Sequence, residues 1–471
     1  MNSSAKIWVK GELSSACFGD QRLNSRFIQI AGQLASKFGG NISSSFNQWK
    51  EIKAAYRFFS NDKVNTGTIL SPHIEQTIQR IRSLKRILLI QDTTYFNFCN
   101  RPKTSGLDIT QRSELLKEAE GLMLHNTLAI TDTGIPLGLL DQHFIDRKEL
   151  QGENHQAKRN CRYWNHCVDQ KESVRWINVL RKTSAIDFGK TQIIHVADRE
   201  SDFYEFYRDA TDLGEEFVIR AARNRGINKV NRREPSSEYL FDYLQNKRAQ
   251  GKVTVNIQVN GASKFRDVAL SVIYTKVSIP PPPNKTKKKD GALPMIELFA
   301  VMAIERKPPA GHDPLCWVLL TNLPIVTLED AIEKINWYSL RWNIELFHKV
   351  LKSGCAVEKA QLRDAERLKK YIVLKSIIAW RLFWLSRTQK QKQDNSCLEV
   401  LTRREWTLLY KKMNKSQPPD TPPTIGEAYV WIAKLGGYIG RNTDPPPGMI
   451  SLWKGWQRLM DMVEDYRDIC G

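Results

Sequence analysis

Hydrophobic and polar positions divide the chain into a helical, a strand-rich and a second helical part. Near the N-terminus, apolar residues recur at helical spacing in 26–35 and 49–59, which predicts two helices. From about residue 85, short apolar runs bounded by turn residues predict β-strands instead. These runs are 86–92, 124–131, 137–144, 192–198 and 216–221, with helical patterns at 174–184 and 201–211. The order of elements predicts an α/β core behind a small helical unit.

Strand-like sequence then continues where a closing helix is expected. Alternating or apolar runs at 253–259, 268–274, 298–304 and 317–321 predict further strands. A long helical pattern begins near Leu328 and resumes, after a bend, through Lys352. An apolar helix at 371–385 and a mostly helical C-terminal part follow. The fold class predicted is therefore α/β with an additional β-rich segment and helices at both ends.

Composition narrows the functions that this chain can have. Its 471 residues carry a formal charge of +20, which favours a polyanionic partner such as nucleic acid. No apolar run reaches the roughly 18 residues that a spanning helix needs, and 1–6 lack an apolar signal core. We expect a cytoplasmic protein without a membrane partner. The eight cysteines are scattered, and the spacing of His155, Cys161, His166 and Cys167 matches no common zinc pattern.

Two carboxylates follow short apolar strands. Asp92 ends the run 86–92, and Asp198 ends the run 192–198. Because open α/β sheets place ligands at the carboxyl ends of their strands, both side chains are candidates for one site. For either residue alone, the alternative is an aspartate that only serves turn chemistry.

A third candidate carboxylate lies in the long helical pattern. At about 100° per residue, four polar residues fall within an arc of roughly 60° on one helix face. They are Tyr338, Arg341, Glu345 and Lys352, opposite Leu340, Ile344, Phe347 and Leu351. A solvated face with one Arg–Glu pair is the alternative. A phosphate-handling site uses all four, because Glu binds a divalent ion while Arg, Lys and Tyr contact phosphate. Three carboxylates favour Mg²⁺ or Mn²⁺, and two such ions catalyse phosphodiester hydrolysis and strand transfer.

These motifs together resemble those of a known family. Tyr338, Arg341, Glu345 and Lys352 match in full the Tyr-x₂-Arg-x₃-Glu-x₆-Lys signature of the DDE transposases of the insertion-sequence-four family. This is the bacterial hairpin-forming cut-and-paste type that includes the transposon-five transposase. The segments beginning at Asp92 and Asp198 match its two Asp motifs. The resemblance extends over nearly the whole chain, from 53–59 in the N-terminal part to 435–438 and 452–456 near the C-terminus.

The resemblance implies a ribonuclease-H-like catalytic core with a β-rich insertion. The domains expected are a helical DNA-binding domain at 1–68, a catalytic domain at 69–375 with the insertion at about 226–315, and a helical dimerisation domain at 376–471. It also implies catalysis by Asp92, Asp198 and Glu345 with two metal ions. The implied pathway runs through a DNA hairpin, with double-stranded transposon ends and target DNA held by a homodimer in a synaptic complex, associated with the bacterial nucleoid.

Further DNA contacts follow from the same resemblance. Trp317 is expected to stack on a flipped base, the alternative being an ordinary core tryptophan. Arg220 is expected to contact DNA, whereas Arg223 and Arg225 could form a solvated patch. In the N-terminal domain the expected contacts come from four basic residues, Arg22, Arg26, Lys53 and Arg57.

Two other functions stay open at this stage. One is a structure-specific nuclease on the same core that performs no strand transfer. The other is a catalytically silent DNA-binding regulator derived from a transposase. Mg²⁺-dependent strand cleavage separates the enzymes from the regulator.

Overall fold

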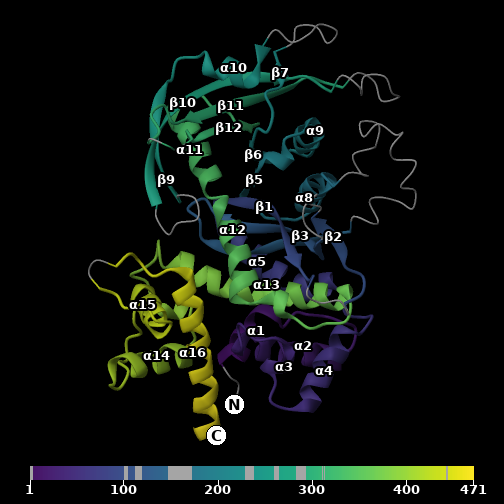
Figure 1. Cartoon of the computed structure of the whole chain (residues 1–471), viewed down its shortest axis with the longest axis vertical. Coiled ribbons are helices and arrows are strands. Elements are labelled where there is room, and N and C mark those ends of the chain that lie inside the picture. The colour runs from purple at the N-terminus through teal and green to yellow at the C-terminus, as the bar shows by residue number, and fades with distance from the viewer. Residues whose placement is uncertain are drawn as a thin grey trace. The chain divides into compact units, whose positions relative to one another are not determined.

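The computed structural model describes most of the chain (Figure 1). The described residues are 4–99, 104–111, 119–146, 172–228, 238–258, 265–282, 293–309, 311, 313–441 and 444–470. The candidate zinc segment with His155, Cys161, His166 and Cys167 lies outside them.

The chain forms two compact units, and each is built from several stretches of sequence. Unit 1 comprises 1–83, 93–146 and 344–471, and unit 2 comprises 84–92 and 147–343. Strand β1 (Arg86–Asn97) and helix α12 (Trp342–Lys349) each run from one unit into the other. The predicted domain limits at 68 and 375 fall inside helices α5 (Thr66–Arg82) and α13 (Ala365–Thr388), and this division stays a prediction.

Unit 1 begins with helices α1 to α5, the first four drawn in purple in Figure 1. Their bounds are α1 Ser4–Leu13, α2 Gln21–Ser36, α3 Ile42–Ser45, α4 Trp49–Phe59 and α5 Thr66–Arg82. Phe18, Phe27 and Phe58 form an aromatic core, with ring centroids 5.2 to 5.9 Å apart. Buried aromatic rings of this kind contribute much of the stability of so small a helical bundle.

The C-terminal part of unit 1 is also helical. Its elements are the π-turn η5 Val350–Gly354, η6 Val357–Lys359, α13 Ala365–Thr388, η7 Cys397–Glu399, α14 Arg403–Asn414, α15 Ile425–Leu435 and α16 Met449–Cys470. Buried α13 contacts the N-terminal helices through two lysines. Lys375 donates to the Phe38 carbonyl at 2.6 Å, and Lys370 donates to the Phe59 carbonyl at 3.1 Å. Both carbonyls lie at or just beyond a helix C-terminus, where a cation is favourable.

Three strands complete unit 1, together with the later residues of β1. They are β2 Asp108–Gln111, β3 Ala119–Thr131 and β4 Pro136–Ile145. β3 pairs antiparallel with both β2 and β4. The β3–β4 hairpin confirms the two strands predicted on either side of the turn at 132–136.

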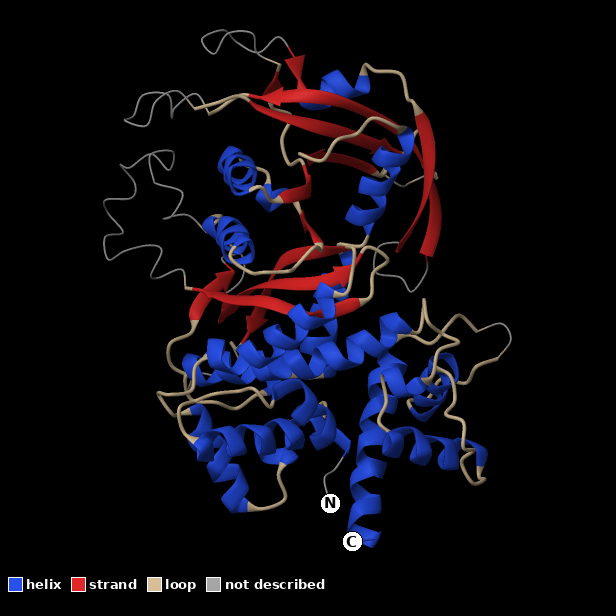
Figure 2. Cartoon of the chain, turned by 180° about the vertical axis from the view of Figure 1, so that it is seen from behind, coloured by secondary structure: helices blue, strands red, loops and turns tan. Residues whose placement is uncertain are grey.

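Unit 2 is built on seven neighbouring strands of a mixed sheet, which are red in Figure 2. The strands are β1, β5 Gln192–Ala197, β6 Glu216–Arg220, β12 Cys316–Thr321, β11 Ile296–Ile304, β10 Phe265–Ile279 and β9 Gly251–Gln258, in that spatial order. The first three are parallel to one another, and the rest pair antiparallel. The strands predicted for the insertion therefore extend the core sheet through β12.

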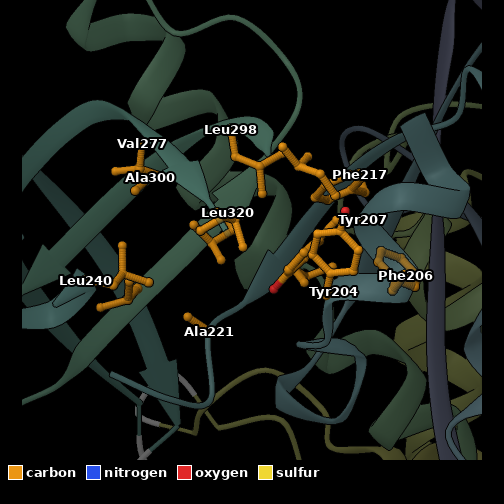
Figure 3. Packing of buried hydrophobic residues seen from close by; sticks show 14 of the residues in the cluster. Tyr204, Phe206, Tyr207, Phe217, Ala221, Leu240, Val277, Leu298, Ala300 and Leu320 are labelled. Atoms are coloured by element: carbon orange, nitrogen blue, oxygen red, sulfur yellow. The ribbon is translucent and has the colours of Figure 1, made fainter. Parts of the chain in front are cut away.

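The remaining elements of unit 2 cover this sheet or connect its strands. They are α8 Val174–Ser184, η3 Arg199–Ser201, α9 Tyr204–Leu213, β7 Gly226–Ile227, β8 Glu238–Tyr239, α10 Leu240–Gln245 and α11 Leu328–Ser339. Figure 3 shows Tyr207 and Phe217 packing together, with Leu298, Ala300 and Leu320 from the antiparallel strands in the same cluster. One apolar cluster thus spans the parallel and antiparallel parts of the sheet, which stabilises them as a single layer.

The structure confirms the α/β class and the helical parts at both ends. Helices α4 and α8 have the bounds expected from the hydrophobic pattern. Helices α1 and α5 were not predicted, and β1 continues to Asn97, so the prediction that this strand ends at Asp92 is wrong. Over the described residues, no helix has the combination of length and apolar character that crossing a bilayer requires.

Candidate active site

Asp92 and Asp198 lie near the ends of the paired parts of two neighbouring parallel strands of unit 2. The register pairs Leu89 with His195 and Ile90 with Val196. Each aspartate lies two residues beyond the last of these pairs, Asp92 within β1 and Asp198 directly after β5. Neighbouring strands are about 4.8 Å apart, and register partners point to the same face of the sheet. The strand pairing therefore places the backbones of these two half-buried residues near each other.

The local setting of the two aspartates differs. Asp92 lies inside β1, whereas Asp198 follows the last residue of β5 and caps the 3₁₀ turn η3. One carboxylate oxygen of Asp198 accepts a hydrogen bond from the Glu200 N–H at 2.9 Å. The turn interpretation of Asp198 is thus correct, but it does not exclude a ligand role, because a carboxylate accepts several bonds at once.

Behind Asp92, a polar chain crosses the parallel strands. Gln91 Nε2 lies 3.0 Å from His195 Nδ1, and His195 Nε2 lies 2.8 Å from Glu215 Oε2. Gln91 and His195 are fully buried. Because side chains alternate along a strand, Gln91 lies on the sheet face opposite Asp92. This network was not predicted, although each apolar run contains a polar residue, Gln91 or His195, that could have indicated it.

Arg341 forms an ion pair with the first aspartate. Its Nη1 lies 3.8 Å from Asp92 Oδ2, and the two side chains are 14% and 19% exposed. Arg341 occupies a break between α11 and α12, where the Asn343 side chain donates to the Leu340 carbonyl at 2.8 Å. A partly buried guanidinium can also bind a phosphate oxygen.

The break changes the predicted arrangement of the signature residues. Tyr338 lies in α11, Arg341 in the break, Glu345 in α12, and Lys352 in the π-turn η5. The bend that the sequence pattern predicted is therefore present, and the four residues do not lie on one continuous regular helix. The break and the wider π-turn both change the angular position of the residues that follow. The apolar residues that were predicted to pack on the core do so, since Ile344, Phe347 and Leu351 are fully buried.

Glu345 and Lys352 belong to unit 1. Glu345 is half-buried in α12, and the nearby His348 is held by Asn126 of β3, whose Nδ2 donates to His348 Nε2 at 3.0 Å. Gln142 of β4 in turn donates to Asn126 Oδ1 at 2.7 Å. Lys352 Nζ lies 5.7 Å from the centroid of the Phe96 ring. The structure thus places Asp92, Asp198 and Arg341 in one unit, while the joining of Glu345 to the two aspartates stays a prediction.

Trp317 and Tyr338 pack against each other in unit 2. Their ring centroids are 5.3 Å apart at 71°, an edge-to-face contact, and the residues are 8% and 5% exposed. Both rings are therefore largely buried in this state. Stacking of Trp317 on a DNA base stays a prediction that requires the indole to become accessible.

The three arginines at and after the end of β6 have different roles. Arg220 Nη2 donates to the Cys316 carbonyl at 3.0 Å and is half-buried. Arg225 Nη2 lies 2.5 Å from Asp202 Oδ1, and the Asp202 side chain is fully buried. The suggestion that Arg225 belongs to a solvated patch is wrong, because it neutralises this buried carboxylate. Arg223 is exposed, as predicted.

The N-terminal basic residues lie on helices α2 and α4. Asp20 caps α2 and pairs with Arg22 at 3.2 Å, whereas Arg26 is half-buried. Lys53 and Arg57 are exposed on α4. Among the aromatic residues of α4, Phe58 and Phe59 lie on the inner face and are buried in the core. The exposed aromatic residue is Trp49 instead.

The donor set determines which metal ion would fit. Among the residues that the structure describes, no group of three or more His, Cys, Asp or Glu side chains is close enough to hold a metal ion. The register-matched pair Asp92 and Asp198 offers only carboxylate oxygens, which suit a hard divalent cation rather than zinc.

Three family models match the chain in N- to C-terminal order. "Transposase DNA-binding" matches residues 5–64, and "Transposase DDE domain" matches 132–382, more than half of the chain. "Transposase Tn5 dimerisation domain" matches 377–470. Asp198 and Glu345 lie within the second match, whereas Asp92 lies between the first two matches.

Proposed function

The chain belongs to the DDE transposases, a family that binds DNA, forms homodimers and depends on divalent metal ions, and we propose that Asp92, Asp198 and Glu345 are its catalytic carboxylates. The observation that supports this proposal is the parallel pairing of β1 with β5 up to Ile90 and Val196, each two residues before one of the aspartates. Glu345 is included because it lies in the DDE match, four residues after the arginine that contacts Asp92. The three residues would form one acidic site.

The metal in this proposal is Mg²⁺, for which Mn²⁺ can substitute, with two ions in each site. Asp92, Asp198 and Glu345 would hold the ions through carboxylate oxygens. When bound, such a pair activates an attacking oxygen and stabilises a leaving oxygen. The ions would also relieve the repulsion among the three carboxylates, so binding should be tightest when all three are ionised.

The basic and aromatic residues would position the DNA. Arg341 and Lys352 supply cations for phosphate oxygens, and Arg220 adds a third from the end of β6. Tyr338 would contact phosphate, and Trp317 would leave its contact with Tyr338 to stack on a flipped base. Arg22, Arg26, Lys53 and Arg57 would grip the terminal inverted repeats in the N-terminal domain.

The proposed pathway consists of four phosphoryl transfers. Water first cleaves one strand at the element's end and leaves a 3′-hydroxyl. That hydroxyl attacks the opposite strand, forming a hairpin on the element and releasing the flanking DNA. Water opens the hairpin, and the regenerated 3′-hydroxyl attacks a target phosphodiester, releasing a target 3′-hydroxyl. A homodimer in a synaptic complex would hold both ends during these steps.

A cleavage assay tests this proposal. The full chain is incubated with Mg²⁺ and a labelled duplex that joins the terminal inverted repeat of its element to flanking DNA. A nick at the repeat boundary and a slowly migrating hairpin on a denaturing gel, both lost in Glu345→Ala, are the expected products. A nick without hairpin or strand transfer would favour a simple nuclease. Binding without cleavage would favour the catalytically silent regulator.

A further inference from the structure

Helix α4 presents a row of side chains that its aromatic core does not use. Trp49, Lys53 and Arg57 recur every four residues, so they lie along one side of the helix. Trp49 is 66% exposed, whereas Phe58 and Phe59 on the inner side are 2% and 0% exposed. The helix therefore separates structural aromatic residues from one aromatic residue that faces solvent.

Positively charged side chains lie beside the exposed Trp49 indole. Lys53 Nζ lies 5.3 Å from the centroid of the Trp49 ring, a cation–π distance. Lys50, Lys53 and Arg57 give α4 three cations against the single acidic residue Glu51. A flat apolar ring flanked by cations is the combination with which proteins contact nucleic acid, because phosphates pair with the cations and the ring packs on sugars and bases.

We propose that Trp49 packs against the sugar and base surface of the bound duplex and helps the protein to distinguish its own DNA ends. Lys53 and Arg57 contact phosphates, which are the same in every sequence. An indole in the major groove can instead contact the edges of bases, such as the methyl group of thymine, which differ between sequences, so its contact forms fully only on the correct DNA. This inference rests on the proposed recognition of the element's ends by the N-terminal domain.

Binding measurements separate the indole from the cations. Anisotropy of a labelled end duplex is compared with that of a scrambled duplex of equal length and composition, over a range of salt concentrations without divalent ions. Trp49→Ala is expected to weaken end binding by about tenfold, with scrambled binding and the salt slope nearly unchanged. Lys53→Ala is expected to weaken both duplexes and to lower the salt slope by about 0.9. Trp49→Phe, which keeps a ring, is expected to retain most of the preference.

The controls exclude a structural explanation. Because Trp49 is mostly exposed, Trp49→Ala should unfold at the wild-type temperature. Val326→Ala removes an apolar side chain that is 78% exposed in unit 2 and should leave DNA binding unchanged. Unchanged end binding by Trp49→Ala would overturn the proposal. A changed oligomeric state with intact DNA binding would overturn it too, by placing the indole in a contact between copies of the chain.

The wild-type protein distinguishes this inference from the function on which it depends. If the wild type does not prefer the end duplex over the scrambled duplex, end recognition itself fails, and this proposal fails with it. If the wild type shows the preference and Trp49→Ala keeps it, only the role of Trp49 is wrong.

Discussion

The two units hold their candidate catalytic carboxylates in different ways. In unit 2, Asp92 and Asp198 each lie two residues beyond the last paired residues of the parallel strands β1 and β5. In unit 1, the helix that carries Glu345 contacts β3 through the side chains of His348 and Asn126. Strand register depends on many backbone hydrogen bonds, whereas a side-chain contact depends on two or three residues. Substitutions that spare the backbone should therefore affect the position of Glu345 more than that of the aspartates.

The largest expected effect comes from removing a carboxylate itself. Asp92→Ala should reduce cleavage on the order of a thousandfold or more, because a metal ligand is lost. End binding should stay within about twofold of wild type, since phosphate contacts elsewhere supply most of the affinity. Single-turnover cleavage and gel-shift assays on the same duplex measure both. Cleavage at the wild-type rate would show that Asp92 is not a catalytic ligand.

A second prediction concerns another buried side-chain network of unit 1. Glu12 Oε1 lies 2.5 Å from His73 Nδ1 and 2.9 Å from Arg80 Nη2. Arg80 Nε also donates to the Leu137 carbonyl of β4. Burial would raise the pKa of Glu12, but His73 and Arg80 outweigh burial and lower the pKa to about 2 from its ordinary value of 4.5. Glu12 should therefore contribute about 3 kcal/mol of stability above pH 4.5, lost as the pH falls from 4.5 to 2.

The partner His73 adds to the same trend. Burial lowers the pKa of His73 below 6.5 in the folded chain. Because the unfolded chain then binds the extra proton, stability should already begin to fall below pH 6.5. Urea midpoints measured between pH 7 and pH 3 test this, with Glu12→Gln as the control that should flatten the acidic part of the curve. A wild-type curve as flat as that of Glu12→Gln would contradict the prediction.

The Asn126 contact tests the helix that bears Glu345 directly. Asn126→Ala leaves buried His348 and Gln142 without their partner and should cost about 2 kcal/mol of unfolding free energy. Cleavage should fall by about tenfold, because α12 loses its tie to β3. The stability loss is measured by urea denaturation and the rate by single-turnover cleavage at saturating protein. Wild-type cleavage by a destabilised variant would show that this contact does not position Glu345.

The smallest effect is expected for the polar chain behind Asp92. His195→Leu removes the partner of Gln91 and Glu215 and should destabilise the protein by about 1–2 kcal/mol. If backbone register suffices to align Asp92 with Asp198, cleavage should change by less than about threefold, as measured under conditions where the variant is folded. A large loss of cleavage would instead show that unit 2 also depends on side-chain contacts.

Much of this molecule could be predicted from local sequence pattern. The strands around Asp92 and Asp198, helices α4 and α8 and the β3–β4 hairpin all follow from periodicity and turn residues. The β-rich insertion was also visible, because β-branched and apolar alternation persists after β6. The fold class was therefore predictable, since hydrophobic periods of 2 and 3.6 are properties of short segments.

Other features depend on contacts between distant segments and could not be predicted. A bend in the helix that carries the signature residues was predicted, but the π-turn at Lys352 was not. The ion pair of Arg225 with Asp202 joins residues separated by a strand and a helix. Likewise, the burial of Trp317 and the exposure of Trp49 are opposite outcomes for the same residue type.

The sequence by itself determined the three carboxylates as candidates, the basic charge and the order of the domains' elements, because residue identity and spacing are local. Only the tertiary structure decided that β1 pairs with β5, that Arg341 faces Asp92, and that Trp49 rather than Phe58 or Phe59 faces solvent. Those outcomes depend on which strands pair and which helix faces pack. Strand pairing and packing arise from the whole folded chain, so no short segment of sequence encodes them.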